Sequence, residues 1–347
     1  MKIKLDKKII NLSKNVFVIA EAGVNHNNNL SIAYKMIDKA KEAGADAIKF
    51  QTFISDKIQL KNSKKPDYQK NINSNYFEII KSLEPSFTDQ KKLSKYCKKK
   101  NIIFLSTPYD ETSVDFLSSI NIPLFKIAST DLSNSFLIKY ISKKNKPIFL
   151  STGLASFKEI DESIKLLLKL HMKNKLVLFH TTSSYPTSND EVNLNIIPEY
   201  IKRYKIIVGF SDHTQNEVAS LGAIALGARV LEKHFTLDRT MSGPDQSSSL
   251  EPYELKEWIK KIRIMEKSLG ANSKKITKSE SKNLSMRKVI VIKPISKGTR
   301  ITLKHLYAMR GKKSGILPLE SNLKKIIGKK LLKNIITTKE FSWNMIE

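Results

Sequence analysis

The sequence predicts a (β/α)₈ barrel followed by a small strand-rich domain. Eight short apolar runs each end in polar or charged side chains, and reactive groups at the carboxyl ends of buried parallel strands are typical of such a barrel. The runs are 16–23, 47–53, 102–108, 124–129, 147–153, 176–182, 205–213 and 228–236. The side chains at their ends are, in order, Glu21; Lys49 and Gln51; Thr107; Lys126 and Ser129; Ser151; His180 and Tyr185; Asp212 and His213; Glu232 and His234.

Helix-like segments separate the predicted strands. The clearest is 30–44, where Ile32, Met36 and Ala40 share one face and Gly44 stands where a helix C-cap would stand. Strict alternation of strands and helices predicts a parallel sheet. The remaining predicted helices are 86–100, 113–120, 134–144, 156–170, 216–227 and 254–270.

The length of 347 residues exceeds the roughly 250 residues of a typical barrel and leaves room for a second domain. We assign 1–270 to the barrel, 271–283 to a polar linker and 284–347 to a domain of short β-branched runs separated by glycine. The long polar stretch 54–75, which includes Tyr68, is predicted to form a lid over the barrel mouth.

Composition narrows the functional class. The net charge is +28, but the lysines are spread along the whole chain, so solvated helix faces explain them better than a nucleic-acid surface does. No run approaches the roughly 18 apolar residues of a membrane span, and the amino terminus lacks the apolar region of a signal peptide. A single cysteine, Cys97, excludes an internal disulfide. We expect a cytoplasmic enzyme without nucleic-acid or membrane partners.

Two histidines at adjacent strand ends, His213 and His234, predict a divalent-metal site, with Asp245 following nearby. Imidazole ligands suit several transition metals, and carboxylate or water ligands shift the preference towards Mn²⁺ or Mg²⁺. Two protein ligands leave positions open for water and substrate, as a catalytic metal requires. The structural alternative is that each histidine caps its own strand through a backbone hydrogen bond.

Charged and hydroxyl side chains at other strand ends predict an anion-binding catalytic pocket. Glu21 is a candidate general base, or a structural partner for Lys49. Lys49 and Lys126 form either an anion clamp or a Schiff-base nucleophile. Tyr185, before Pro186, either lines a sugar subsite or packs in its loop. The hydroxyl donors of the predicted clamp include Ser106, Thr107, Ser129 and Ser151.

Taken together, the motifs resemble the sialic acid synthase family, whose members condense phosphoenolpyruvate with a hexosamine aldehyde. The resemblance is carried by AEAGVNHN, GADAIKFQT, FLSTPYD, FKIAS, PIFLSTG, SSYPT, GFSDHT, GARVLEKHFT and GPDQSSSL, in order along the barrel. The tail segment ISKGTRITLKHLYAMRG resembles the antifreeze-like (SAF, β-clip) domain of bacterial members.

The resemblance implies a role for each matching residue. His213 and His234 would bind Mn²⁺, with Mg²⁺ or Co²⁺ as alternatives, and Glu21 would handle the water that adds during the reaction. Arg310, delivered by the SAF domain of a partner subunit, would complete the site of a domain-swapped homodimer. Lys49, Lys126, Thr107, Ser129 and Ser151 match the phosphate and carboxylate contacts, and Gln51, Tyr185 and Asp245 match sugar-side and metal-side residues.

Two departures from the family pattern bear on the acceptor sugar. Thr130-Asp131 stands where N-acetylneuraminate-forming members commonly have Gly-Glu, and Ser183 stands where an asparagine is common. We expect N-acetylmannosamine as the acceptor; the alternative is a diacetamido-trideoxyhexose leading to legionaminic or pseudaminic acid. A Schiff-base aldolase and a basic nucleic-acid binder are the remaining competing hypotheses.

Overall fold

The computed structural model describes residues 2–5, 8–11, 15–61, 76–271, 273–282, 286–311 and 314–347. The chain divides into two compact units, Met1–Gly270 and Ala271–Glu347, and each is described by itself.

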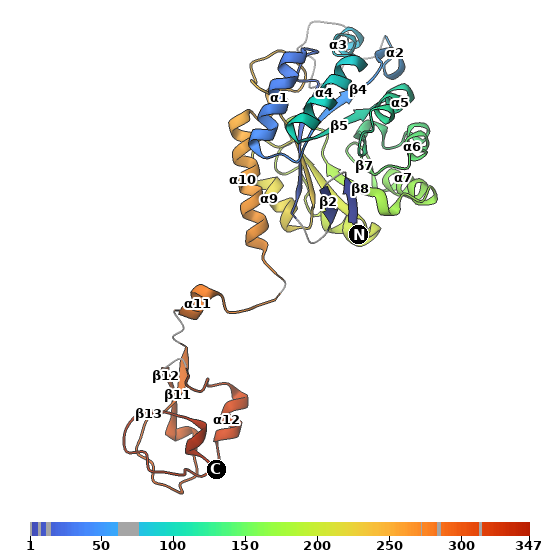
Figure 1. The fold of residues 1–347 in the computed structure, drawn as a ribbon. Coiled ribbons are helices and arrows are strands. Elements are labelled where there is room, and N and C mark those ends of the chain that lie inside the picture. The colour runs from blue at the N-terminus through green and yellow to red at the C-terminus, as the bar shows by residue number, and fades with distance from the viewer. Residues whose placement is uncertain are drawn as a thin grey trace. The chain divides into compact units, whose positions relative to one another are not determined.

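The first unit contains a nearly closed barrel of eight parallel strands (Figure 1), which confirms the predicted barrel. The strands follow the order β5-β4-β3-β10-β9-β8-β7-β6, and the two end strands, β5 and β6, approach within 8 Å between Cα atoms. The strands are β3 (Phe17–Gly23), β4 (Ala47–Thr52), β5 (Ile103–Pro108), β6 (Phe125–Ile127), β7 (Ile148–Ser151), β8 (Leu176–Thr181), β9 (Ile207–Asp212) and β10 (Val230–His234).

Helices cover the outside of the barrel (Figure 1). Local sequence sets their ends: the Asn29 side chain caps α1, and Gly44 ends that helix in the left-handed conformation that glycine adopts easily. The helix α8 was not among the predicted helices. The helices of this unit are α1 (Leu30–Ala43), α2 (Ser55–Ile58), α3 (Tyr76–Ser82), α4 (Phe87–Lys100), α5 (Glu111–Ser119), α6 (Ser135–Ser142), α7 (Phe157–Lys169), α8 (Ile196–Tyr204), α9 (Val218–Ala225) and α10 (Pro252–Leu269).

An antiparallel amino-terminal hairpin, β1 (Lys2–Leu5) and β2 (Lys8–Asn11), precedes the barrel and was not predicted. Ile3 and Leu5 are buried in one cluster with barrel residues such as Phe17, Phe149 and Phe179. Lysine alternates with apolar residues in β1, as expected for a strand with one buried face.

The predicted lid is described only in part. Its first residues form the short helix α2, and α3 begins directly after it, whereas 62–75, with Tyr68, lies outside the described residues. Among the described helices, none is both long and apolar enough to cross a membrane.

The second unit has a three-stranded antiparallel sheet in the order β12-β11-β13. Its own core includes Val289, Ile301 and Phe341. A strand-bearing carboxyl-terminal unit was predicted, and its identity as an antifreeze-like domain stays a prediction. The elements are α11 (Lys278–Lys282), β11 (Arg287–Val291), β12 (Leu306–Arg310), α12 (Glu320–Ile326) and β13 (Lys339–Glu340).

Replacing Leu5 by alanine tests the contribution of the hairpin to stability. Leu5 is fully buried, so Leu5→Ala should lower the free energy of unfolding by about 2–5 kcal/mol through lost burial and an unfilled cavity. Urea unfolding followed by circular dichroism measures the change. The control Leu168→Ala, at a side chain 40% exposed, should cost well under half as much; equal costs would contradict a buried hairpin.

Candidate active site

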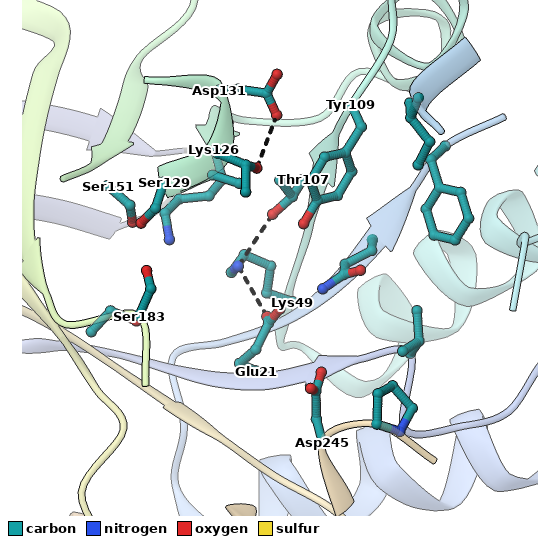
Figure 2. Close-up of a pocket in the computed structure, with 18 of the residues that line it drawn as sticks. Glu21, Lys49, Thr107, Tyr109, Lys126, Ser129, Asp131, Ser151, Ser183 and Asp245 are labelled. Atoms are coloured by element: carbon teal, nitrogen blue, oxygen red, sulfur yellow. Dashed lines mark hydrogen bonds and ion pairs between the residues drawn. The ribbon is translucent and has the colours of Figure 1, made fainter. Parts of the chain in front are cut away.

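A cavity of 740 Å³ opens at the carboxyl ends of the barrel strands. Every one of the eight strand ends contributes to its lining, either directly or through the residues that follow the strand. Figure 2 shows side chains from separate strands converging on this cavity. The predicted site residues that line it are Glu21, Lys49, Gln51, Thr107, Lys126, Ser129, Asp131, Ser151, Ser183, Tyr185, His213, His234 and Asp245.

Two predicted site residues lie elsewhere. The Ser106 hydroxyl contacts Thr52 Oγ1 at 2.6 Å and does not line the cavity, because consecutive side chains of a strand point to opposite faces and Thr107 takes the inner position. The structure therefore removes Ser106 from the predicted substrate contacts. Arg310 is exposed at the end of β12 in the second unit, so its delivery into a partner's barrel stays a prediction.

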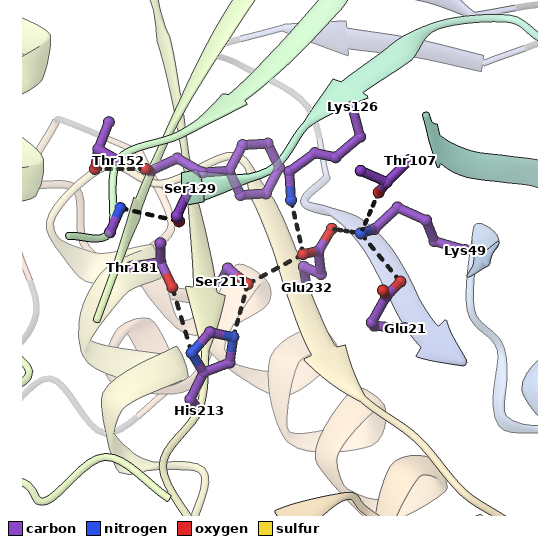
Figure 3. Close-up of polar contacts among 12 residues, drawn as sticks. Glu21, Lys49, Thr107, Lys126, Ser129, Thr152, Thr181, Ser211, His213 and Glu232 are labelled. Atoms are coloured by element: carbon purple, nitrogen blue, oxygen red, sulfur yellow. Dashed lines mark hydrogen bonds and ion pairs between the residues drawn. The ribbon is translucent and has the colours of Figure 1, made fainter. Parts of the chain in front are cut away.

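A buried network of two lysines and two carboxylates lies at the centre of the cavity (Figure 3). Lys49 Nζ lies 3.1 Å from Glu21 Oε2 and 3.4 Å from Glu232 Oε2. Lys126 Nζ, from the opposite part of the barrel wall, lies 2.8 Å from Glu232 Oε1. All four residues are at most 4% exposed, so each charge depends on its partners rather than on water.

The two carboxylates differ in how many donors they contact. Glu232 contacts both lysines and accepts a hydrogen bond from Ser211 Oγ at 3.1 Å, whereas the Glu21 carboxylate has Lys49 as its one charged or hydrogen-bonding contact among the described residues. Burial raises the pKa of Glu21 to about 8; Lys49 opposes this rise and the charge on Glu232 adds to it. Burial also opposes ionisation of Glu232, but the two lysines outweigh it and hold the Glu232 pKa below its usual value. Near neutral pH, Glu232 is therefore the ionised carboxylate and Glu21 carries a proton that it gives up readily.

The two lysines differ in the same way. Burial lowers the pKa of Lys126 to about 8, against the attraction of Glu232. Burial also opposes the charge on Lys49, but Glu21 and Glu232 outweigh it and raise the Lys49 pKa. A Schiff base needs a neutral amine, so the structure argues against Lys49 as a nucleophile.

The hydroxyl groups of Ser129, Ser151 and Ser183 gather on the side of the cavity where the Lys126 amine lies, and together they form an anion cradle (Figure 2). Ser129 begins the 3₁₀ turn η2 (Ser129–Asp131) after β6, Ser151 ends β7, and Ser183 follows β8. Gly153 allows these groups to converge, because a Cβ atom there would collide with the hydroxyls of Ser129 and Ser183. A cation with several neutral donors is a suitable site for a phosphate or carboxylate group.

The two histidines lie next to each other at the ends of the neighbouring strands β9 and β10, with ring centroids 5.5 Å apart. His213 Nδ1 lies 2.7 Å from the carbonyl oxygen of Thr182, so Nδ1 carries the proton and Nε2 keeps its lone pair. Burial lowers the pKa of His213 to about 4 and holds that of His234 well below its usual value. Both rings are therefore neutral near pH 7, as metal ligands must be.

The histidine pair fits a catalytic metal with an incomplete protein ligand set. Within the described part of the chain, no group of three or more His, Cys, Asp or Glu side chains could hold a metal ion. His234 Nδ1 is buried and has no hydrogen-bond partner among the described residues; Asp245 Oδ2 lies 3.8 Å away. A buried imidazole nitrogen without such a partner, on a ring next to a second neutral histidine, suits an ion that takes its remaining ligands from water and substrate.

A third region of the cavity is suited to a sugar. Gln51, Asp131 and Tyr185 supply polar groups, and the Tyr185 ring lies 4.2 Å from the His213 ring between centroids. Burial raises the pKa of Asp245 to about 6. The same cavity has an apolar wall, formed by the clustered residues Val24, Phe53, Ile58, Ile80, Leu83 and Tyr109.

Sequence reasoning missed two parts of this site. Glu232 was identified as a polar strand end but was given no role, although it links both lysines. Glu232 stands out in the sequence as a charged residue in the strand end Glu-Lys-His. Its partner Lys126 is 106 positions away, so the sequence does not reveal that the two meet. The apolar wall was missed because its residues come from four separate segments of the chain.

Comparison with known proteins agrees with this geometry. Residues 36–274 match the family model described as the NeuB family. The chain is 43% identical over 291 residues to the N,N'-diacetyllegionaminic acid synthase of Campylobacter jejuni, covering 82% of this chain and 87% of that protein. It is 36% identical over 343 residues to the enzyme of the same name from Legionella pneumophila, covering 96% of each.

A solved structure supports the same assignment. The N-acetylneuraminic acid synthetase of Leptospira borgpetersenii, in complex with citrate, superposes with a TM-score of 0.73 at 33% identity, covering 82% of this chain and 95% of that chain. The family match spans more than half of the chain, and the barrel places the matching residues around one cavity. By sequence and by fold, the chain belongs to the NeuB family.

Proposed function

We propose that this protein is a nonulosonic acid synthase that condenses phosphoenolpyruvate with the aldehyde of an N-acetylated hexosamine and releases phosphate. The observation that carries the proposal is the meeting, in one cavity, of an anion cradle, a proton-exchanging carboxyl group and a neutral histidine pair. The two relatives described above are named as synthases of a nonulosonic acid, which supports the same reaction class.

The chain's own residues account for binding and orientation. Lys126 and the hydroxyls of Ser129 and Ser151 hold the phosphate and carboxylate of phosphoenolpyruvate, while Lys49 and Thr107, 3.2 Å apart, extend the cradle towards Glu21. Phosphoenolpyruvate C3 forms the new carbon–carbon bond with the aldehyde carbon, which leaves a cationic centre at C2. A divalent ion on His213 and His234, Mn²⁺ in our proposal, would supply Lewis-acid polarisation of the aldehyde.

Water completes the reaction. It adds at C2, and one of its protons passes through the ionised Glu21 carboxylate to the alkoxide that the aldehyde oxygen has become. The C–O bond to phosphate then breaks as C2 becomes a carbonyl, and the second proton leaves with phosphate. A Glu21 pKa of about 8 suits this role, because a base works best when its pKa lies near the working pH.

We further propose that the acceptor is a diacetamido-trideoxyhexose rather than N-acetylmannosamine. The diacetamido sugar has a methyl group at C6 and a second acetamido group where N-acetylmannosamine has hydroxyls. The apolar wall would cover these methyl groups, each worth about 0.8 kcal/mol when buried. The names of the relatives from C. jejuni and L. pneumophila support the same choice.

Phosphate release from phosphoenolpyruvate tests the reaction and the acceptor together. With Mn²⁺ present, kcat/KM should be about tenfold higher for one diacetamido-trideoxyhexose epimer than for N-acetylmannosamine, because two buried methyl groups at about 0.8 kcal/mol each amount to roughly a factor of ten. Ile80→Ser should reduce this preference. Ile79→Ser, in the same helix and cluster but not in the cavity lining, is the matched control. Equal use of both sugars would contradict the acceptor assignment, and no release with any sugar would contradict the reaction.

Glu21→Gln should abolish turnover and leave phosphoenolpyruvate binding within a fewfold of the parent. Glutamine keeps the shape of the side chain but cannot exchange the proton of the attacking water. Phosphate release measures the first effect and isothermal titration calorimetry the second. A variant with near-parental kcat would eliminate Glu21 as the base.

The pH dependence of kcat/KM for phosphoenolpyruvate should be a narrow bell centred near pH 8. Activity rises as Glu21, with a pKa of about 8, loses its proton, and falls as Lys126, also with a pKa of about 8, loses its charge. Lys126→Arg keeps a positive charge at all these pH values. The alkaline limb should therefore shift to higher pH, whereas the acid limb should keep its position. An unmoved alkaline limb would show that another group causes it.

A further inference from the structure

The strand ends that carry His213 and His234 also carry a buried ion pair on the opposite face of the sheet. In the parallel register of β9 and β10, Lys233 pairs with Asp212. Alternation along each strand turns Ser211, His213, Glu232 and His234 towards the cavity, so Asp212 and Lys233 point outward, beneath the helices. Asp212 is 1% exposed and Lys233 is 2% exposed.

Hydrogen bonds extend this pair into the turn that follows His213. Lys233 Nζ lies 3.1 Å from Asp212 Oδ2 and donates to the Thr214 carbonyl oxygen at 2.6 Å. Asp212 Oδ1 accepts from the backbone N–H of Thr214 at 2.8 Å and from its hydroxyl at 2.7 Å, and Asp212 Oδ2 accepts from Ser220. The pair thus ties together the residues on both sides of His213 and the residue before His234.

Stability alone does not explain such a pair. Two charges buried between a sheet and its helices pay a desolvation cost that apolar side chains of similar volume avoid, so replacing both is often neutral or stabilising. Their positions suggest a different reason. They adjoin the two histidines in sequence, on the two neighbouring strands whose ends set the separation of the rings.

We propose that Lys233 and Asp212 are positioning residues that hold the His213 and His234 rings at the spacing required to share one divalent ion. This inference rests on the proposed metal site. The carbonyl oxygen of Thr182 orients the His213 ring itself, and the ion pair fixes the backbone that carries each ring. The pair acts from behind the strands and touches neither substrate nor metal.

Mn²⁺ affinity of the ligand-free full-length protein tests the proposal without relying on activity. The double variant Lys233→Met with Asp212→Leu removes both charges and leaves no unpaired one. It should keep its thermal unfolding midpoint within a few degrees of the parent and bind Mn²⁺ at least tenfold more weakly, as is typical when groups that support metal ligands are lost. Electron paramagnetic resonance of free Mn²⁺ measures the affinity.

Two reference variants separate the possible outcomes. The control Arg263→Met with Asp46→Leu removes an ion pair of 3.2 Å that does not line the cavity, and it should leave Mn²⁺ affinity unchanged. His213→Ala should weaken Mn²⁺ binding strongly; if it does not, the metal site itself fails. If His213→Ala weakens binding but the Lys233/Asp212 double variant binds like the parent, the positioning role is overturned.

Asp212→Asn keeps the test decisive if the double variant does not fold. Asparagine is nearly the same shape and can still accept from the Thr214 N–H, but it loses its charge attraction to Lys233. Mn²⁺ binding at least threefold weaker than that of the parent is expected, and parental affinity would overturn the proposal.

Discussion

The buried network of Glu21, Lys49, Glu232 and Lys126 is the constraint on which the rest of the site depends. Glu21 and Lys49 are paired in register on neighbouring strands, whereas Lys126 reaches Glu232 from a strand that is not its neighbour in the sheet. With Glu21 protonated, two lysines face a single ionised carboxylate. The network therefore has an excess of one positive charge near neutral pH, which suits an anionic substrate.

This network also divides the cavity into regions with different tasks. The hydroxyl-lined end near Lys126 suits an anion, and the neutral rings of His213 and His234 suit the divalent ion that we propose. Figure 3 shows continuous polar contacts from His213 through Ser211 and Glu232 to Lys49 and Glu21. A change in charge at one end is therefore felt by the proton on Glu21 at the other end, because coupling is strong where water is excluded.

The sequence predicted the barrel because each strand is a separate apolar run, and it predicted most of the site because barrel strands end at one face. The prediction failed where it depends on which of two adjacent strand residues points into the barrel. Ser106 and Thr107 are adjacent, so only one of them faces inward, and an all-apolar run such as IIFL does not reveal which. His180 shows the same ambiguity: it bonds to the carbonyl oxygen of Val192 and does not line the cavity. Lys126–Glu232 could not be predicted because it joins strands that are not hydrogen-bonded neighbours.

The alternation of inward-facing and outward-facing side chains also explains how one strand can carry reactive groups and still be held firmly in the barrel wall. On β9 and β10, inward-facing residues supply the reactive groups, and the outward-facing Asp212 and Lys233 are tied to each other and to the next turn. A wall of apolar residues would be easier to bury, but it would hold each strand end only through non-directional packing. Directional bonds at the strand ends limit sideways movement there, which matters because a shift of about 1 Å at a reacting group can cost about a hundredfold in rate. On these two strands, the charges whose burial is costly lie directly beside the histidines that we propose they position.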